Sequence, residues 1–370
     1  MIYPIEPLKL EKNRVWRTYK GGKALGEWLG EEEPEDSYYP EEWISSTVKA
    51  LNPNNTINKS EGYCSFKIAG NKKEKLIDFI KSNPKLTLGE SHLNRFGKDS
   101  AVLMKLLDAA ERLTIQVHPS KEKAKTLFQS PFGKTEAWYI MEGRDIEGEP
   151  PHIFVGFKTG ITKKLIIELF ENQDIEKMLS LMNKIYVKPG EVYLIPGGLV
   201  HAIGKGCFMM EIQEATDYTI RLERTNADGI NIDDMLVHQG LGFEKMFECI
   251  DMDSFSDESY LNKIKLIDEE FTLEGNKTLI SYKDTECFAL KKYNIFKDKL
   301  LLKNDETFST LIITAGKGVL KWNNKSIKLY KGDKIFLPYI CDNIEVLAYK
   351  ESLSFLRCYP PYSQGGLFNL

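Results

Sequence analysis

Short runs of alternating polar and apolar residues dominate the chain. Residues 114–118 (TIQVH) alternate at a period of two, and so do the runs on either side of the Pro189-Gly190 turn in residues 185–196 (IYVKPGEVYLIP). Alternation at this period is typical of a β-strand with one buried face. From about Leu261 onward, similar short runs are separated by Gly, Asn-Asn and Lys-Gly-Asp turns. The pattern predicts a mainly β protein with antiparallel strands.

Three regions depart from this alternation. Residues 74–95, 162–183 and 231–246 carry apolar residues at a spacing close to 3.6, which is typical of an amphipathic helix. The run 76–81 (LIDFIK) is the clearest, and it ends before Pro84, because the residue before a proline disfavours helical geometry. We therefore expect helices to be inserted at these three places.

One strand pattern occurs twice. Residues 189–196 (PGEVYLIP) align with residues 331–338 (KGDKIFLP), and five residues past the proline stand His201 in the first copy and Asn343 in the second. A chance match of a common turn-and-strand pattern is the alternative explanation. The repeat predicts two β-modules, a catalytic one over 1–250 and a degenerate one over 275–370 that binds no metal. The boundary is expected in the polar, turn-like stretch 248–275.

Composition and charge narrow the possible functions. The chain has 50 basic and 54 acidic residues, a formal charge of −4, so it lacks the cationic surplus of a nucleic-acid-binding protein. We find no signal-peptide pattern at the start and no apolar run near the roughly 20 residues of a membrane span. None of the six cysteines stands in a C-x-x-C pair, which favours reduced thiols. We expect a cytoplasmic protein without nucleic-acid or membrane partners.

Four polar residues could hold a metal ion. Gln116 and His118 share one face of a predicted strand, as do Lys134 and Glu136, and His201 follows the turn at 196–200 (PGGLV). Taken singly, these are also what a polar core pair, a solvated salt bridge or a satisfied histidine would give. Together, two imidazoles, a carboxylate and an amide oxygen suit a borderline divalent ion such as Zn²⁺, Mn²⁺ or Co²⁺.

Three longer strings carry a family resemblance. Residues 113–120 (LTIQVHPS), 133–140 (GKTEAWYI) and 196–206 (PGGLVHAIGKG), in this order and spacing, resemble the type I phosphomannose isomerases, a metal-dependent branch of the cupins. Further matches are Trp16 with Gly21-Gly22, residues 42–45, residues 103–109, and the stretch from Glu211 through Asp217 to Arg221. The resemblance is good over roughly 15–224 and loose in the last third.

The resemblance implies a cupin fold, the jelly-roll form of the double-stranded β-helix, and one divalent ion, with zinc expected and manganese or cobalt as alternatives. Its implied metal ligands are Gln116, His118, Glu136 and His201. It implies catalytic roles for Lys105, Asp217 and Arg221, and substrate-binding roles for Thr114, Lys134 and Arg224. The family often has a second basic residue six positions after Arg221, where this chain has Ala227, so Arg224 is taken as the substitute.

The activity implied is the interconversion of mannose 6-phosphate and fructose 6-phosphate through a cis-enediol. The small-molecule partner would be a sugar phosphate. The base remains open between Asp217, a lysine and a water at the metal. Two other functions stay in view: isomerisation of a different or unphosphorylated sugar, motivated by Ala227, and a non-enzymatic sugar-binding or regulatory cupin.

Overall fold

A computed structural model describes residues 5–52, 60–68, 72–296 and 299–363. Its strands form three large sheets and one small one, and neighbouring strands within them run antiparallel. The fold is mainly β and antiparallel, as the alternation predicted. Among the described residues, no helix is both long enough and apolar enough to cross a membrane.

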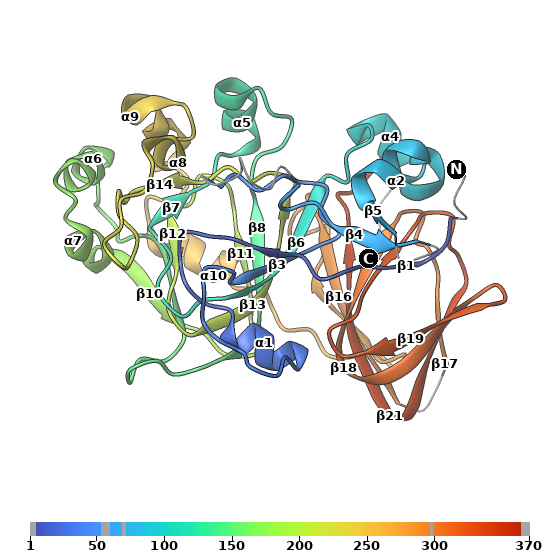
Figure 1. Cartoon of the computed structure of the whole chain (residues 1–370). Helices are drawn as coiled ribbons and strands as arrows, with labels where there is room; N and C mark the ends of the chain where they lie inside the picture. The colour runs from blue at the N-terminus through green and yellow to red at the C-terminus, as the bar shows by residue number, and fades with distance from the viewer. Residues whose placement is uncertain (1–4, 53–59, 69–71, 297–298, 364–370) are drawn as a thin grey trace.

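Two of the sheets face each other in the first part of the chain (Figure 1). The six-stranded sheet has the order β11-β8-β13-β6-β3-β2, and the five-stranded sheet has the order β10-β9-β12-β7-β14. The six-stranded sheet comprises β2 (Arg14–Val15), β3 (Glu41–Ile44), β6 (Val102–Asp108), β8 (Glu136–Gly143), β11 (Val192–Ile195) and β13 (Cys207–Glu214). The five-stranded sheet comprises β7 (Gln116–Val117), β9 (His152–Phe157), β10 (Met182–Tyr186), β12 (His201–Ile203) and β14 (Ile220–Arg221).

The third, eight-stranded sheet is built mostly from the end of the chain, drawn in orange and red in Figure 1. It comprises β1 (Leu8–Lys9), β15 (Asn276–Ile280), β16 (Ala289–Phe296), β17 (Lys299–Leu302), β18 (Ser309–Trp322), β19 (Lys325–Tyr330), β20 (Lys334–Leu337) and β21 (Ile344–Tyr359). Strand β1 pairs with β20, so the start of the chain joins this sheet rather than the first module in which we expected it. The pairing covers an edge of β20 that would otherwise be open. Strands β4 (Ser65–Lys67) and β5 (Lys73–Lys75) form a separate two-stranded sheet, which a bridge between Leu10 and Phe66 joins to the segment after β1.

Helices occupy each of the three regions with helical spacing. They are α2 (Leu76–Ser82), α3 (Pro84–Leu88) and α4 (Glu90–Phe96), then α6 (Lys163–Asn172) and α7 (Ile175–Ser180), then α8 (Asp234–His238), α9 (Gly242–Lys245) and the 3₁₀ turn η2 (Met246–Cys249). The second region is divided into α6 and α7, because α6 ends at Gln173, which has a left-handed backbone with φ 50°. The periodicity did not indicate α1 (Lys23–Leu29), α5 (Lys121–Phe128), η3 (Glu258–Tyr260) or α10 (Leu261–Ile264).

The two copies of the repeated pattern form comparable strands. Strand β11 and strand β20 stand at the same place in the repeat, and His201 begins β12 while Asn343 directly precedes β21. The Pro189-Gly190 turn leads from the five-stranded sheet to the six-stranded one, and Gly190 has a φ of 96° there.

The six-stranded sheet is buried on both faces, and all seven residues of β6 are buried. One face, with Met104, Leu106 and Ile212, packs against the eight-stranded sheet. The other face, with Leu107 and Trp138, packs against the five-stranded sheet. Side chains two residues apart on a strand share a face. The polar residues two positions away from Leu107 and from Trp138 therefore point into the space between the six-stranded and five-stranded sheets.

Candidate active site

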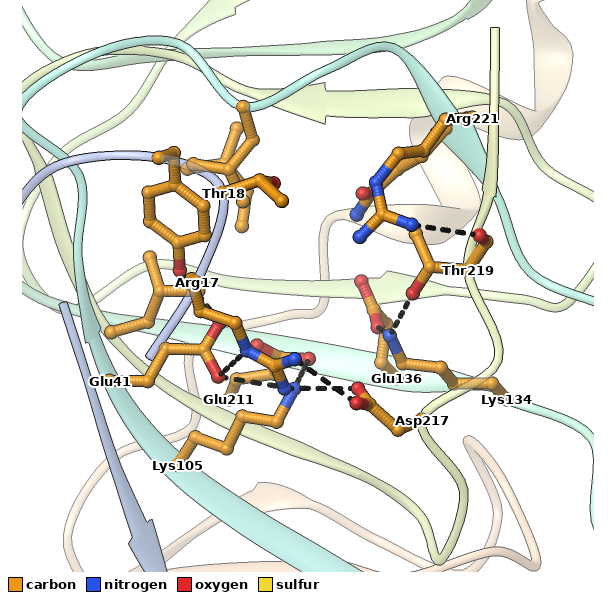
Figure 2. Close-up of a pocket in the computed structure, with 15 residues that line it drawn as sticks. Arg17, Thr18, Glu41, Lys105, Lys134, Glu136, Glu211, Asp217, Thr219 and Arg221 are labelled. Atoms are coloured by element: carbon orange, nitrogen blue, oxygen red, sulfur yellow. Dashed lines mark hydrogen bonds and ion pairs between the residues drawn. The ribbon is translucent and has the colours of Figure 1, made fainter. Parts of the chain in front are cut away.

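A cavity lined largely by charged side chains lies between the six-stranded and five-stranded sheets (Figure 2). Its wall includes three residues of the connection between β2 and α1 (Arg17, Thr18 and Tyr19) and residues from strands of both sheets. Among the described residues that line it, four are cations and four are anions. The cations are Arg17, Lys105, Lys134 and Arg221, and the anions are Glu41, Glu136, Glu211 and Asp217.

Strand register explains how several of these charges meet. Lys105 on β6 is the direct partner of Glu211 on β13 and of Trp43 on β3. The Lys105 ammonium lies 3.4 Å from Glu211 and 3.8 Å from Glu41. Lys134 lies 3.6 Å from Glu136 and donates a hydrogen bond of 3.4 Å to Thr219.

Arg17 has the most complete set of partners. Its Nη1 and Nη2 each donate to one oxygen of Asp217 at 3.0 Å, and its Nε donates to Glu41 at 2.9 Å. Burial alone would raise the pKa of both carboxyls, but the guanidinium outweighs it. The pKa of Asp217 is therefore lowered, and that of Glu41 falls to about 2.

Arg221 differs from the other three cations, because it makes no ion pair with any described residue. Its Nη1 donates to the carbonyl oxygens of Leu236 at 2.5 Å and Thr219 at 3.3 Å, and its buried Nε has no hydrogen-bond partner. Burial lowers its pKa to about 10, which leaves it charged at neutral pH. The residue as a whole is half-buried, so its charge is partly desolvated, and an anion that enters the cavity would compensate it.

Glu211 is the carboxyl whose pKa stands near neutrality. Burial raises that pKa to about 7, although Lys105 acts in the opposite direction. Glu211 and Asp217 therefore share one cavity with pKa values displaced in opposite directions. Such a displacement is typical of sites that separate a proton-transferring group from a permanently charged one.

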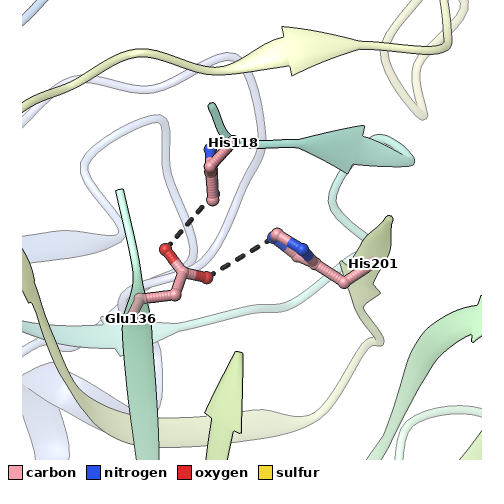
Figure 3. Close-up of side chains that lie close together, drawn as sticks. All are labelled: His118, Glu136 and His201. Atoms are coloured by element: carbon pink, nitrogen blue, oxygen red, sulfur yellow. Dashed lines mark ion pairs between the residues drawn. The ribbon is translucent and has the colours of Figure 1, made fainter. Parts of the chain in front are cut away.

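Two histidines and a glutamate meet beside this cavity (Figure 3). Nε2 of His118 lies 3.2 Å from Oε2 of Glu136, and Nε2 of His201 lies 3.4 Å from Oε1 of the same carboxylate. One candidate ligand atom from each of the three residues lies within 4.8 Å of those of the other two. In the described part of the chain, this is the one group of His, Cys, Asp and Glu side chains close enough together to hold a metal ion.

The backbone sets the orientation of both imidazoles. Nδ1 of His118 bonds to the carbonyl of Tyr218 at 2.8 Å, and Nδ1 of His201 bonds to that of Leu199 at 2.9 Å. A carbonyl only accepts, so Nδ1 carries the proton and Nε2 is left with a lone pair. Burial lowers the pKa of both histidines, that of His118 to about 3, so both are neutral.

These donors fit a divalent metal ion. Nε2 of His118 and Oε2 of Glu136 are buried and have no hydrogen-bond partner among the described atoms, although polar atoms are rarely buried unpaired. Gln116 pairs in register with His201, and its amide Nε2 lies 3.2 Å from His201 Nε2. Rotation of that amide by 180° would aim an oxygen at the same point. Two neutral nitrogens and two oxygens make a set that suits zinc.

Two residues from the sequence-based set belong neither to this cavity lining nor to the histidine–glutamate cluster. Thr114 is buried next to the lining residue Leu113 but does not itself line the cavity. The Arg224 guanidinium stacks on two aromatic rings, 5.0 Å from Phe170 and 4.1 Å from Phe243. The other eight residues are brought together in the cavity or in the histidine–glutamate cluster beside it.

Sequence reasoning missed several residues of the cavity. They are Arg17, Thr18, Tyr19, Glu41, Glu211 and Thr219. The alternation of Glu211 with apolar neighbours in the buried strand β13 is a signal that could have identified it. No comparable signal marks Arg17, because it lies in a connection without periodicity.

Comparison with known proteins gives consistent matches over most of the chain. The family model for the phosphomannose isomerase type I catalytic domain matches residues 9–139, and the model for the mannose-6-phosphate isomerase cupin domain matches residues 278–351. Mannose-6-phosphate isomerase ManA of Bacillus subtilis is 30% identical over 276 residues, which cover 72% of this chain and 79% of the relative.

Solved structures share the fold. A mannose 6-phosphate isomerase from Bacillus subtilis superposes with a TM-score of 0.70 at 23% identity, covering 96% of this chain and 99% of the other. A zinc-bound mannose 6-phosphate isomerase superposes with a TM-score of 0.72 at 16% identity, covering 96% and 100%. The matching family models and the relative at 30% identity together establish that this chain belongs to the type I phosphomannose isomerases.

Proposed function

We propose that this protein is a metal-dependent aldose–ketose isomerase that interconverts mannose 6-phosphate and fructose 6-phosphate through a cis-enediol. The observation that carries the proposal is Arg221, a half-buried guanidinium with no carboxylate partner among the described residues, which lines a cavity next to a candidate metal-binding cluster. A cation in this position requires an anion from the substrate, either a phosphate or the charge that develops on the enediol oxygens.

Gln116, His118, Glu136 and His201 would hold one divalent ion, which we propose to be zinc. When bound, the ion would supply Lewis-acid stabilisation of negative charge on the sugar oxygens. The four residues come from strands of two facing sheets and from the segment that follows β7, so the fold fixes their directions before any ion arrives.

The formal charge of the cavity favours a phosphorylated sugar. The formal charges of the four cations and four anions that line the cavity cancel. A bound divalent ion would therefore leave an excess of two positive charges. A sugar phosphate brings a charge of about −1.5 to −2 at neutral pH. An unphosphorylated sugar would leave that excess buried and uncompensated.

Isomerisation of the open-chain aldose shifts the hydroxyl proton of O2 to O1 and moves the carbon-bound proton of C2 to C1. The group that carries it needs a pKa near the working pH, and Glu211, at about 7, meets that requirement. We therefore propose Glu211 as the base, although the sequence led us to consider Asp217. Asp217 is ionised and held by Arg17, so it suits hydrogen-bond acceptance better than proton transfer.

The remaining residues have proposed roles around the sugar. Lys105 would keep Glu211 in place, and Lys134 and Arg221 would bind the phosphate or the developing charge. Thr114 remains a proposed phosphate contact and Arg224 a proposed substrate contact, each of which requires a rearrangement of its present packing. The six cysteines are free thiols, which supports a cytoplasmic location as part of the proposal.

A turnover assay tests the proposal directly. Metal-loaded protein is offered mannose 6-phosphate, free mannose and other phosphorylated aldoses, and ketose formation is measured. We expect turnover of mannose 6-phosphate with a much lower kcat/KM for free mannose. Preference for a free sugar would favour the alternative substrate class, and binding without turnover of any sugar would favour a sugar-binding cupin.

A further inference from the structure

The segment 17–20, between Trp16 and Gly21, forms one wall of the cavity. Asn226 donates to the Thr18 carbonyl at 3.1 Å, and Lys20 makes a 2.7 Å ion pair with Asp228. The ring of Trp16 stacks on Tyr38. These contacts hold the segment at both ends, so the direction of the Arg17 side chain is set by the fold.

Arg17 lies at the centre of a buried charge network. Its side chain is 8% exposed, and its guanidinium packs 4.8 Å from the ring of Trp43. Two parallel hydrogen bonds to Asp217 fix the plane of that carboxylate, and the bond to Glu41 fixes the guanidinium itself. Glu41 is held in turn by the hydroxyl of Tyr19 at 2.7 Å.

Asp217 has a second anchor on the same side. The backbone N–H of Leu51 donates to Asp217 Oδ2 at 2.9 Å. The carboxylate nevertheless lines the cavity, where oxygen lone pairs not used by Arg17 and Leu51 can accept further hydrogen bonds. In Figure 2, Arg17 reaches Asp217 from the side of the cavity opposite Arg221.

We propose that Arg17 is a positioning residue of the active site, which holds the Asp217 carboxylate at the cavity wall as the acceptor for a sugar hydroxyl. This inference rests on the proposed isomerase function, because it gives Asp217 a substrate to contact. Arg17 acts through Asp217 and need not touch the sugar. Its planar, two-pronged geometry is essential to this role, and lysine cannot reproduce it.

The test uses Arg17→Gln and Arg17→Lys in the full-length, metal-loaded protein. Glutamine removes the charge, and lysine keeps it but loses the parallel bonds. We expect kcat/KM for mannose 6-phosphate to fall about 10²-fold in Arg17→Gln, since a displaced catalytic contact typically costs that much. Arg17→Lys should lose less activity. Arg95→Gln is the matched control, because Arg95 forms an exposed pair with Glu286 and lies outside the cavity.

The pH profile separates positioning from a merely structural role. Without the guanidinium, burial of Asp217 is no longer opposed by Arg17, so the pKa of Asp217 should rise toward that of Glu211, and the acidic limb should become steeper than the single ionisation expected for the wild type. Arg17→Lys should keep the wild-type acidic limb while its kcat stays reduced. In an Asp217→Asn background, Arg17→Gln should cause little further loss.

An Arg17→Gln variant with wild-type kcat/KM and an unchanged pH profile would overturn the inference. So would an equal loss of activity from Arg17→Gln in the wild-type and Asp217→Asn backgrounds. If the wild-type protein turns over no sugar, the proposed function fails, and the pairing is still measurable by thermal unfolding. Arg17→Gln should then lower the midpoint at neutral pH more in the wild-type background than in Asp217→Asn, where only the bond to Glu41 is lost.

Discussion

At the scale of single residues, the cavity distinguishes charges that are already paired from the one that is not. Arg17, Lys105 and Lys134 each have a carboxylate within ion-pair distance. Among the described residues, the hydrogen-bond partners of Arg221 are two backbone carbonyls. Paired charges can set the geometry and pKa values of a site, whereas an unpaired, half-buried cation is available to an incoming or developing anion.

Replacement of Arg221 by alanine tests this difference. We expect kcat to fall about 10²–10³-fold, as it does when a donor to a developing negative charge is removed. Metal content should stay at the wild-type level, because Arg221 is not among the proposed ligands. Steady-state kinetics and metal analysis on the same samples provide the measurement, with Arg95→Ala, in an exposed pair with Glu286, as the control. Turnover of mannose 6-phosphate by Arg221→Ala at the wild-type rate would show that Arg221 is misassigned.

Glu211 predicts the pH dependence of the reaction. Burial raises its pKa to about 7, so the base form is lost as the pH falls through that region. A cation bound nearby would lower the pKa of Glu211. The pH profile of kcat/KM should therefore show an acidic limb at or below about pH 7. Glu211→Gln should remove this limb and reduce kcat about 10²–10⁴-fold. A Glu211→Gln variant that keeps both the limb and the rate would exclude Glu211 as the base.

At the scale of elements, the alternation of side chains explains what the sequence could reveal. Gln116 and His118, or Lys134 and Glu136, lie two residues apart, so their shared face follows from strand geometry alone. The pairing of His201 with Gln116 depends on which strands become neighbours, and no local pattern specifies that. The place of Arg17 in the cavity could not be predicted for a related reason. Arg17 lies in a connection between elements, and a connection has no periodicity that would indicate where a side chain points.

The Gly21-Gly22 pair shows how one element positions another. A Cβ on Gly21 would lie 1.8 Å from the carbonyl oxygen of Asp108, at the end of β6. This close approach lets the Asp108 carboxylate accept the N–H groups of Gly22 at 2.9 Å and Ala24 at 2.7 Å, at the start of α1. Strand β6 also carries Lys105, so the contact links the N-terminal segment to the site.

Gly21→Ala should therefore destabilise the protein. The overpacked backbone contact costs about 1–3 kcal/mol, and a displaced Asp108 would no longer satisfy the first turn of α1. Gly30→Ala at the other end of α1 is the control, because nothing lies within 4 Å of its Cβ and only left-handed backbone strain, about 1–2 kcal/mol, is added. Chemical denaturation of both variants gives the comparison. An equal loss of stability in the two would contradict the close-contact explanation.

At the scale of the whole molecule, the eight-stranded sheet supports the outer face of the sheet that carries the site. Apolar packing joins the two sheets, and three polar contacts cross the same interface. Lys292 donates to the Tyr139 hydroxyl at 3.0 Å, Ser45 and Thr310 share a hydrogen bond of 2.7 Å, and Lys334 forms an ion pair with Glu42. Glu42 stands between Glu41 and Trp43 on β3, and Glu41 lines the cavity.

The buried pair of Glu42 and Lys334 gives the prediction at this scale. Both side chains are almost fully buried, so Lys334→Met would leave the Glu42 carboxylate without its main partner. Breaking a buried ion pair in this way costs about 3–5 kcal/mol. Arg14 remains 3.8 Å from Glu42, so we expect a value near the lower end of that range.

The double variant Glu42→Gln/Lys334→Met is the decisive comparison. It removes both charges, and it should recover most of the free energy of unfolding that Lys334→Met loses, because the cost comes from an uncompensated charge rather than from lost packing. Lys328→Met, on an exposed position of β19, should change stability by less than about 0.5 kcal/mol. If the double variant is as unstable as Lys334→Met, packing of the lysine stem explains the loss instead. If the double variant does recover stability, kcat/KM should follow the same course, with a fall in Lys334→Met and a recovery in the double variant. The reason is that the strand that carries Glu42 also places Glu41 in the cavity wall.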